Sequence, residues 1–362
     1  MRWKEQLLTL TPYQPGKSID EVKKQFNLES IVKLASNENP FGCSEKVLSA
    51  IQMSRQSFAL YPDGYATNLR ETLATSLNVT PEELIFGNGS DNIIQIISRA
   101  LLTVDSNTVM ATPTFSQYRH NAIIEGAESK EIPLIDGEHD LEGMLSAIDE
   151  KTNIVWVCSP NNPTGTYISK SKLIEFLDKV PAHVLVVLDE AYYEYVVADD
   201  YYDSVSLTRT YSNLIVLRTF SKIYGLASLR VGYGIGHPSI IRALDPAREP
   251  FNLNSFAQLA AQAALEDKEF VQQTKQKNRD GLGQFYEFCN SNKLFYYPSQ
   301  GNFILIDFEV DADQVCQFLI EKGFIVRSGK ALGFPTSIRV TVGSTEQNEG
   351  VLKAIREFLT RK

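Results

Sequence analysis

The chain has 362 residues, of which 43% are hydrophobic and 22% are charged, as in ordinary water-soluble globular proteins. This length exceeds what one small hydrophobic core usually supports, so we expect two domains. The net charge is −9, from 35 basic and 44 acidic residues, which excludes a protein built to neutralise a nucleic-acid backbone. An anionic ligand must therefore be held by a few placed cations.

The cysteines, the histidines and the first residues limit the class of protein further. The four cysteines include no C-x-x-C pair, so we expect free thiols in a reducing compartment, and the four histidines lack metal-ligand spacing. Lys4 and Glu5 interrupt any signal-peptide core, and no apolar run approaches the ~18 residues of a membrane span. We expect a cytoplasmic protein with no metal site, no membrane segment and no nucleic-acid partner. The cysteines are Cys43, Cys158, Cys289 and Cys316.

Between residues 90 and 222, amphipathic segments alternate with short β-rich runs. The segment 90–103, "SDNIIQIISRALLT", predicts a helix that Ser90 can cap, and 169–180 and 114–126 are further helix candidates. The apolar runs are typical of strands buried on both faces of a parallel sheet. Their order predicts an α/β domain, with a mixed, mostly parallel sheet between helices. The runs are 107–113, 153–160, 183–192 and 214–222.

Past residue 250 the pattern changes to long helical periodicities around three strand-like runs. This change predicts a smaller α+β C-terminal domain after a hinge near 245–254. We expect residues 1–40 to form an N-terminal segment that joins the small domain, 41–248 the large domain and 249–362 the small one. A ligand is expected in the cleft between the two domains. The helical stretches are 255–292, 311–322 and 345–361, and the strand-like runs are 295–308, 324–329 and 337–343.

Two loops that follow predicted strands carry groups that could meet a ligand. The glycine-rich "FGNGSDN" (86–92) runs into a helix start, where converging N–H groups can cradle a phosphate, although such a sequence can also be only a turn. "CSPNNPTG" (158–165) is either a rigid loop or the carrier of an Asn162 amide that donates to a ligand oxygen.

An acid and a lysine follow the next two strands. Asp189 ends the most apolar strand and is costly to bury unless a cation meets it, either a Lys or Arg or a cationic ring nitrogen. Lys222 lies just after Thr219 and Ser221, eight residues before Arg230. A lone lysine is normally solvated. With Asp189, an asparagine and a phosphate cradle, however, this lysine matches the needs of pyridoxal phosphate, and desolvation would make its amine nucleophilic.

At this point a resemblance to a known family covers nearly the whole chain. The sequence resembles the fold-type I pyridoxal-phosphate-dependent aminotransferases and, among them, the histidinol-phosphate aminotransferase family. The matching motifs run in family order from residue 12 to residue 343. They are "PYQPG", "LASNENPFG", "YPDG", "GNGSDN", "TPTFSQY", "NNPTG", "DEAYYEY", "RTFSKIYGLASLRVGYG" and "IRVTVG".

The resemblance implies roles around the cofactor. Lys222 forms the covalent link to the aldehyde and moves the proton between the substrate Cα and the cofactor C4′. Asp189 pairs with the ring nitrogen, while Asn162 and Tyr192 bond the phenolic oxygen. Phe115 stacks on the ring. The residues that would hold the phosphate are Gly89, Ser90, Asp91, Thr219, Ser221 and Arg230.

The resemblance also implies a substrate pocket and a homodimer. Tyr61 would reach the phosphate of the neighbouring subunit's cofactor, so the site would need two chains. Arg339 would bind the carboxylate of the amino donor, and Arg327 would be a second anion contact. Tyr13, Asn37 and Phe251 would line the substrate pocket.

Two positions depart from the common pattern of the family. Asn92 lies where many relatives have glutamate, which changes the charge near the phosphate cradle. Phe115 often appears as tyrosine, so stacking is kept but a hydroxyl is lost. Neither departure touches Lys222, Asp189 or Asn162.

The implied reaction is transamination of L-histidinol phosphate with 2-oxoglutarate, which gives imidazole acetol phosphate and glutamate in histidine biosynthesis. An aromatic amino-acid aminotransferase and a phosphothreonine-type decarboxylase of the same fold are alternatives. A non-catalytic dimeric ligand sensor has no support, because no basic face or DNA-binding segment is present. A nicotinamide dehydrogenase lacks its G-x-G-x-x-G turn after a strand.

Overall fold

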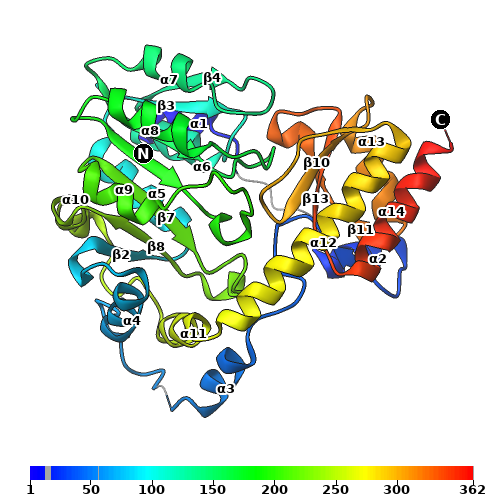
Figure 1. Ribbon diagram of the computed structural model, residues 1–362, viewed down its shortest axis with the longest axis horizontal. Coiled ribbons are helices and arrows are strands. Elements are labelled where there is room, and N and C mark those ends of the chain that lie inside the picture. Colours follow the sequence, from blue (N-terminus) through cyan, green and yellow to red (C-terminus); the bar gives the residue numbers. More distant parts are fainter. Residues whose placement is uncertain (13–17, 56, 362) are drawn as a thin grey trace.

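The computed structural model describes residues 1–12, 18–55 and 57–361, which fold into a larger and a smaller unit side by side (Figure 1). The larger unit is built on a seven-stranded sheet. Strands β7, β6, β5, β3 and β4 are parallel, and β8 is antiparallel to both β7 and β2. In sheet order the strands are β2 (Leu84–Gly87), β8 (Gly232–Gly236), β7 (Leu214–Thr219), β6 (Leu185–Asp189), β5 (Thr152–Cys158), β3 (Asn107–Thr112) and β4 (Glu128–Pro133).

Helices cover both faces of this sheet, which is why its central strands are apolar throughout. One face packs against α5 (Ser90–Leu101), α6 (Gln117–Glu125) and α10 (Pro238–Leu244). The other face packs against a larger set of helices: α3 (Glu45–Met53), α4 (Thr67–Leu77), α7 (Leu141–Ala147), α8 (Lys170–Lys179), α9 (Ser204–Thr210) and α11 (Ser255–Leu265).

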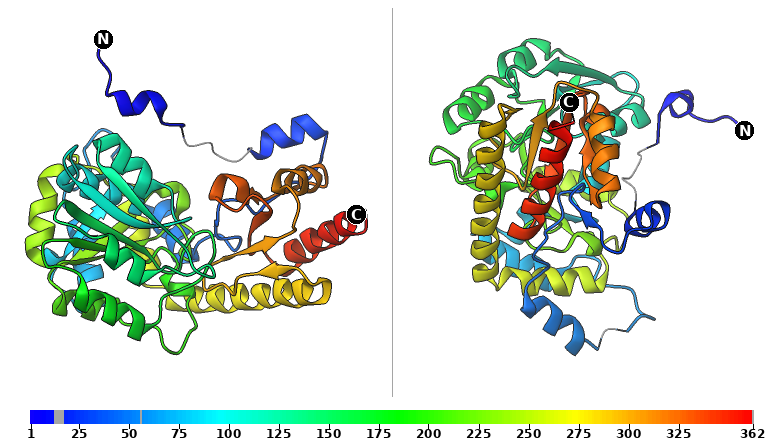
Figure 2. Two further views of the ribbon diagram at one scale, coloured as in Figure 1. Left: turned by 90° about the horizontal axis from the view of Figure 1, so that it is seen from above. Right: turned by 90° about the vertical axis from the view of Figure 1, so that its right-hand side faces the viewer.

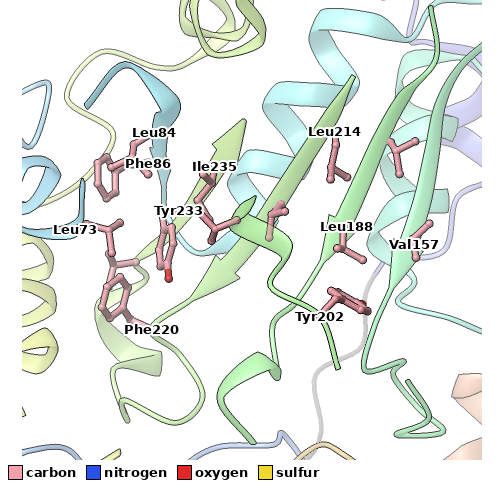
Figure 3. Packing of buried hydrophobic residues seen from close by; sticks show 14 of the residues in the cluster. Leu73, Leu84, Phe86, Val157, Leu188, Tyr202, Leu214, Phe220, Tyr233 and Ile235 are labelled. Atoms are coloured by element: carbon pink, nitrogen blue, oxygen red, sulfur yellow. The ribbon is translucent and has the colours of Figure 1, made fainter. Parts of the chain in front are cut away.

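Side chains of the central strands alternate between the two cores. In β6, Val186 and Leu188 belong to the core under α8 and α9, whereas Leu185 and Val187 belong to the core under α5 and α6. Figure 3 shows the first of these cores, with Leu188 close to Tyr202. This alternation decides which face receives each polar residue at the strand ends.

The smaller unit is an antiparallel sheet with helices packed against it. Its strands are β12 (Arg327–Ser328), β13 (Ser337–Thr341), β10 (Phe303–Asp307) and β9 (Phe295–Tyr296), in that order. Its helices are α12 (Lys268–Asn292), α13 (Ala312–Glu321) and α14 (Thr345–Leu359). The long helix α12 runs along both units (Figure 2).

The N-terminal segment contacts both units. Helix α1 (Glu5–Thr9) lies against α6 of the larger unit, where Lys4 Nζ donates to the Ile124 carbonyl at 3.0 Å. Helix α2 (Ile19–Phe26) and β1 (Val32–Lys33) join the smaller unit, with β1 parallel to β11 (Phe324–Ile325). Residues just after β1 then reach the carboxyl ends of the central strands β6 and β7, where they contact Tyr192 and Lys222.

The predicted α/β class with a mixed, mostly parallel sheet and a smaller C-terminal sheet unit is confirmed. The single helical stretch expected over 255–292 is instead two helices, because Asp267 caps α12 by accepting from the Phe270 amide at 3.0 Å. Helix α11 packs on α3 and α4. We therefore propose that the larger unit includes α11 and that the division falls along α12, past the predicted boundary at 248.

Across residues 1–12, 18–55 and 57–361, every helix is too short or too polar to cross a membrane. The same residues contain no group of three or more His, Cys, Asp or Glu side chains arranged to hold a metal ion.

Candidate active site

A cavity of about 210 Å³ lies where the carboxyl ends of β5, β6 and β7 meet the smaller unit. The start of α5 and the segment after β1 complete its wall. It is lined by Ala35, Ser36, Asn37, Gly89, Ser90, Asp91, Phe115, Cys158, Asn162, Asp189, Ala191, Tyr192, Thr219, Ser221, Lys222, Arg230, Arg327 and Arg339.

Of the sequence-predicted site residues that the structure describes, all but Tyr61 and Phe251 line this one cavity. Tyr61 is 82% exposed and stacks on Phe251, with ring centroids 4.7 Å apart, and neither residue lines the cavity of its own chain. Phe251 has a positive φ of 56°, and its ring also lies against Gly64. Tyr13 lies outside the described residues.

Asp189 is a buried acid that no cation of the described chain pairs with. The residue is 2% exposed, and its oxygens accept from the Tyr118 hydroxyl at 2.8 Å and the Ala191 amide at 3.1 Å. Burial raises the pKa of Asp189 to about 6, although the Tyr118 hydrogen bond acts in the opposite direction. A buried acid of this kind favours a cationic ligand group beside it.

Lys222 faces the same cavity in a less protonated state than an ordinary lysine. Burial lowers the pKa of Lys222 to about 8, and the nearby Arg339 guanidinium acts in the same direction. Its Nζ donates to the Ser36 carbonyl at 3.3 Å and lies 5.7 Å from the centre of the Tyr192 ring. A large fraction of this amine is therefore neutral near pH 8, as a nucleophile or a proton acceptor requires.

The start of α5 and the loop after β7 form one wall of the cavity, called the anion-binding wall here because its groups are of the kinds that bind anions. Gly89 caps α5 with a φ of +78°, and a Cβ on Gly232 would lie only 2.5 Å from the Ser90 amide nitrogen. This close approach requires glycine. Arg230 donates to Ser221 Oγ and to Asp91 Oδ2, both at 3.3 Å. The helix N-terminus, hydroxyl and guanidinium together suit a phosphate group.

The smaller unit contributes two arginines from neighbouring strands. Arg327 of β12 and Arg339 of β13 are register partners, and both line the cavity. Arg339 is 6% exposed and donates to Asn162 Oδ1 at 2.6 Å and to the Ala35 carbonyl at 2.8 Å. The cavity therefore holds cationic groups from the smaller unit opposite the acid and the lysine of the larger one.

Asn37 connects the two units at the floor of the cavity. Its Nδ2 donates to the Tyr192 hydroxyl at 2.9 Å, while Thr341 Oγ1 donates to Asn37 Oδ1 at 3.1 Å. Tyr192 is thereby held by a residue whose other partner belongs to β13.

Sequence reasoning missed Tyr118, Ala35 and Ser36. Tyr118 lies within the quoted motif "TPTFSQY", one helical turn after Phe115, and that spacing is the only signal that could have placed it on the site side of α6. Its ring stacks on Trp156 at 4.9 Å and aims the hydroxyl at Asp189. Ala35 and Ser36 act through backbone carbonyls, which no side-chain pattern reveals.

Comparisons with known proteins agree with this geometry. The family model for aminotransferase class I and II matches residues 29–355. Proteins named histidinol-phosphate aminotransferase from Geobacillus sp. (strain WCH70) and Bacillus subtilis (strain 168) are 60% and 59% identical to this chain. These matches cover 100% and 99% of the chain and 99% and 100% of the relatives.

The chain belongs to the histidinol-phosphate aminotransferases, within the class I and II aminotransferase family. The predicted family is confirmed, and the protein is an enzyme of the aminotransferase class.

Among solved structures, a histidinol-phosphate aminotransferase from Sinorhizobium meliloti, in complex with pyridoxal-5'-phosphate, superposes with a TM-score of 0.89 at 25% identity, covering 99% of this chain and 98% of that one. An L-threonine-O-3-phosphate decarboxylase from Porphyromonas gingivalis has a TM-score of 0.80 at 21% identity, covering 91% and 100%. The second likeness shows the fold alone, so aminotransferases of this family share their architecture with another reaction class.

Proposed function

We propose that the protein is a pyridoxal-phosphate-dependent enzyme that transfers the amino group of L-histidinol phosphate to 2-oxoglutarate, giving imidazole acetol phosphate and glutamate in histidine biosynthesis. One observation carries the proposal: Lys222 and Asp189 share a cavity with the anion-binding wall and with Arg327 and Arg339, and no cation of the described residues pairs with Asp189. The names of relatives about 60% identical over the whole chain support the substrate.

The residues present fit this cofactor. Lys222 would hold the aldehyde carbon through Nζ, Asp189 would pair with the protonated ring nitrogen, and Phe115 would lie on the ring. The phosphate would bind the start of α5, Thr219, Ser221 and Arg230. Asn162 and Tyr192 would bond the phenolic oxygen. Such a cofactor requires an acid for its ring nitrogen and a lysine for its aldehyde, and within the described residues Asp189 has no cationic partner and Lys222 has a lowered pKa.

Pyridoxal phosphate, when bound, supplies an aldehyde for the substrate amine and a ring that stabilises the negative charge left at Cα when its proton departs. Asp189 would keep the ring nitrogen of the bound cofactor protonated, because a carboxylate beside it favours the charged form. The Lys222 amine would take the proton from the substrate Cα as a base and would release it to the cofactor C4′ as an acid. A pKa near 8 suits both roles at neutral pH.

The arginines account for the two chemically different substrates. Histidinol phosphate carries a phosphate ester, whereas glutamate carries two carboxylates, so one pocket must accept either anion. Guanidinium groups bind both through paired N–H donors. Arg339 would bind a carboxylate of 2-oxoglutarate or glutamate, and Arg327 would be the second anion contact. Asn37 would contact the substrate beside Tyr192.

We further propose that the protein works as a homodimer in the cytoplasm. Tyr61 and Phe251 form an exposed aromatic pair away from their own cavity, as expected if they complete the site of a second copy. In that arrangement the Tyr61 hydroxyl would reach the partner's cofactor phosphate.

The test is an assay of purified protein loaded with pyridoxal phosphate, comparing histidinol phosphate, phenylalanine, tyrosine and phosphothreonine, with 2-oxoglutarate as the acceptor. We expect histidinol phosphate to give the highest kcat/KM, with one glutamate formed for each histidinol phosphate consumed. If the aromatic amino acids gave a kcat/KM higher by orders of magnitude, the proposed substrate would be wrong but the proposed transamination would stand. Loss of carbon dioxide from phosphothreonine without glutamate would point to a decarboxylase.

The dimer is tested by mixing two inactive variants. Tyr61→Ala chains keep Lys222, and Lys222→Ala chains keep Tyr61. If Tyr61 serves the other chain, unfolding and refolding the two together should restore one working site per mixed dimer. Activity no higher than the sum of the separate variants would contradict the proposal.

A further inference from the structure

A buried polar layer lies behind the active site, on the opposite face of the large sheet. Because side chains alternate along each strand, the three central strands end with one polar residue on each face. Cys158, Asp189 and Thr219 face the cavity, whereas Ser159, Glu190 and Arg218 face the core under α8 and α9. Glu190 and Ser159 are 0% exposed, and Arg218 is 3% exposed.

Every charge in this layer is paired within the described chain. Arg218 Nε donates to Glu190 Oε2 at 2.9 Å, and Arg218 Nη2 donates to Ser204 Oγ at 3.0 Å. The Ser204 hydroxyl in turn donates to Glu190 Oε2 at 2.7 Å. The guanidinium carbon lies 3.5 Å from the centre of the Tyr193 ring, which covers its flat face.

The layer extends to the loop that carries Asn162. The Tyr201 hydroxyl lies 3.1 Å from Glu190 Oε1 and 3.0 Å from the Ser159 carbonyl. The adjacent Tyr202, stacked on Tyr201, donates to Ser159 Oγ at 3.0 Å. The Tyr201 hydroxyl therefore lies between Glu190 and Ser159 and can donate its one proton to either acceptor, while Tyr202 holds the Ser159 side chain.

Glu190, Tyr193, Arg218 and Ser159 of this layer each lie a few residues from a group of the active site. Glu190 follows Asp189 directly, and Tyr193 follows Tyr192. Arg218 precedes Thr219 directly and Lys222 by four residues, and Ser159 precedes Asn162 by three. The layer thus joins the chain segments that carry the ring partner, the lysine and the two predicted contacts of the phenolic oxygen.

We propose that Glu190 and Arg218 are positioning residues for the cofactor site: their ion pair fixes the ends of β5, β6 and β7 relative to one another, so that Asn162, Asp189 and Lys222 meet one bound group in a single arrangement. The inference rests on the proposed function, because its ligand is pyridoxal phosphate.

Two properties of buried ion pairs support a positioning role. Desolvation makes such a pair no more stabilising than well-packed apolar residues of similar volume, so stability alone does not explain it. Its hydrogen bonds, however, have fixed directions, whereas apolar contacts allow strands to shift. A displacement of about 1 Å at a group that contacts a reacting ligand can cost about 10²-fold in rate.

The experiment measures pyridoxal phosphate affinity of the apoprotein by visible absorbance, together with the unfolding temperature. The variants are Arg218→Met, Glu190→Met and the double variant. Each single variant leaves one charge buried and unpaired and should lower both quantities. The double variant should regain unfolding temperature but still bind the cofactor at least about 10-fold more weakly than the unaltered chain. The single variants alone cannot separate a loss of positioning from a loss of stability, because both quantities fall in them.

Leu319→Ala is the matched control, because Leu319 is a fully buried residue of the smaller unit's core. It should lower the unfolding temperature without a comparable loss of cofactor affinity. A double variant that binds the cofactor as tightly as the unaltered chain would overturn the positioning role.

Tyr201→Phe keeps the inference testable if the double variant does not fold. It removes the hydroxyl between Glu190 and Ser159 and keeps the ring that stacks on Tyr202. We expect a cofactor affinity about 3-fold weaker with little change in unfolding temperature, and unchanged affinity would count against the inference. Failure of the unaltered chain to bind pyridoxal phosphate would instead contradict the proposed function.

Discussion

Asp189 and Glu190 are neighbours in the chain and are both buried, but they face opposite sides of the same sheet. Glu190 accepts hydrogen bonds from Arg218 and from the hydroxyls of Ser204 and Tyr201. The Tyr193 ring covers the guanidinium of Arg218. Asp189 meets a hydroxyl and an amide, and no cation within the described residues pairs with it. A charge balanced within the chain serves the structure, whereas a charge left unbalanced in a cavity indicates a ligand that completes it.

The largest effect should come from Lys222→Ala on the cavity side. Removing the amine eliminates both the covalent link and the proton carrier, so we expect transamination of histidinol phosphate to fall by at least about 10³-fold. Hydride trapping followed by mass spectrometry should find the adduct on Lys222 of the unaltered chain. The surface residue Lys330 provides the control, since Lys330→Ala should keep full activity.

Glu190→Gln should have the next largest effect, on stability. The substitution removes the counter-ion that is hydrogen-bonded to the buried Arg218, which we expect to lower the free energy of unfolding by about 3 kcal/mol. Urea titration measures this change. Glu175→Gln is the matched control, because its pair with Lys179 is exposed and should be worth less than about 1 kcal/mol. Equal losses of unfolding free energy in Glu190→Gln and Glu175→Gln would show that the buried ion pair contributes no more than the exposed one.

Asp189→Asn should change how apoprotein stability depends on pH. The pKa of Asp189 is about 6 in the folded chain and near the ordinary 3.8 when unfolded, so between these values the folded state binds more protons. Stability should therefore fall as the pH rises from about 4 to about 6, by about 3 kcal/mol.

The Asp189→Asn variant should lack that part of the decline when unfolding is followed by urea titration across this pH range. Its transamination should also fall, because an amide does not stabilise a protonated ring nitrogen. Identical pH profiles for the two proteins would show that Asp189 is not the acid we describe.

Tyr118→Phe should have the smallest effect. It keeps the ring on Trp156 but removes the hydrogen bond to Asp189, so the pKa of Asp189 should rise further and the decline in stability should extend to higher pH. We expect an activity about 10-fold lower, as for the loss of a hydrogen bond to a charged group. Tyr211→Phe, which removes a surface hydrogen bond to Asp178, should leave both measurements unchanged.

Much of the fold follows from local patterns in the sequence. The buried strands β3, β5, β6 and β7 are apolar runs of the expected length, and their polar ends lie together because parallel strands end at one sheet edge. The sequence does not predict strand β8, since most residues of "GYGIG" are glycines, which are depleted in strands. The split between α11 and α12 depends on one capping side chain within a continuous periodicity.

The site divides in the same way. Lys222, Asp189 and Arg339 could be predicted because each lies at a fixed position within a short sequence motif. The pairing of Glu190 with Arg218 could not, although both lie within recognised motifs, because no pattern within one strand tells which residue of another strand it meets. Carbonyl contacts from Ala35 and Ser36 depend on the path of the backbone.

That path has a practical consequence for the first forty residues. Ser36 accepts from Lys222, Ala35 accepts from Arg339, and Asn37 donates to Tyr192, yet the strand just before them belongs to the smaller unit. A fragment that begins at residue 41 would keep every strand of the seven-stranded and four-stranded sheets and still lose contacts to a lysine, an arginine and a tyrosine of the cavity. Any rotation of the smaller unit would move Ser36 and so change its hydrogen bond with the lysine. The reactivity of that amine should therefore depend on the relative position of the two units.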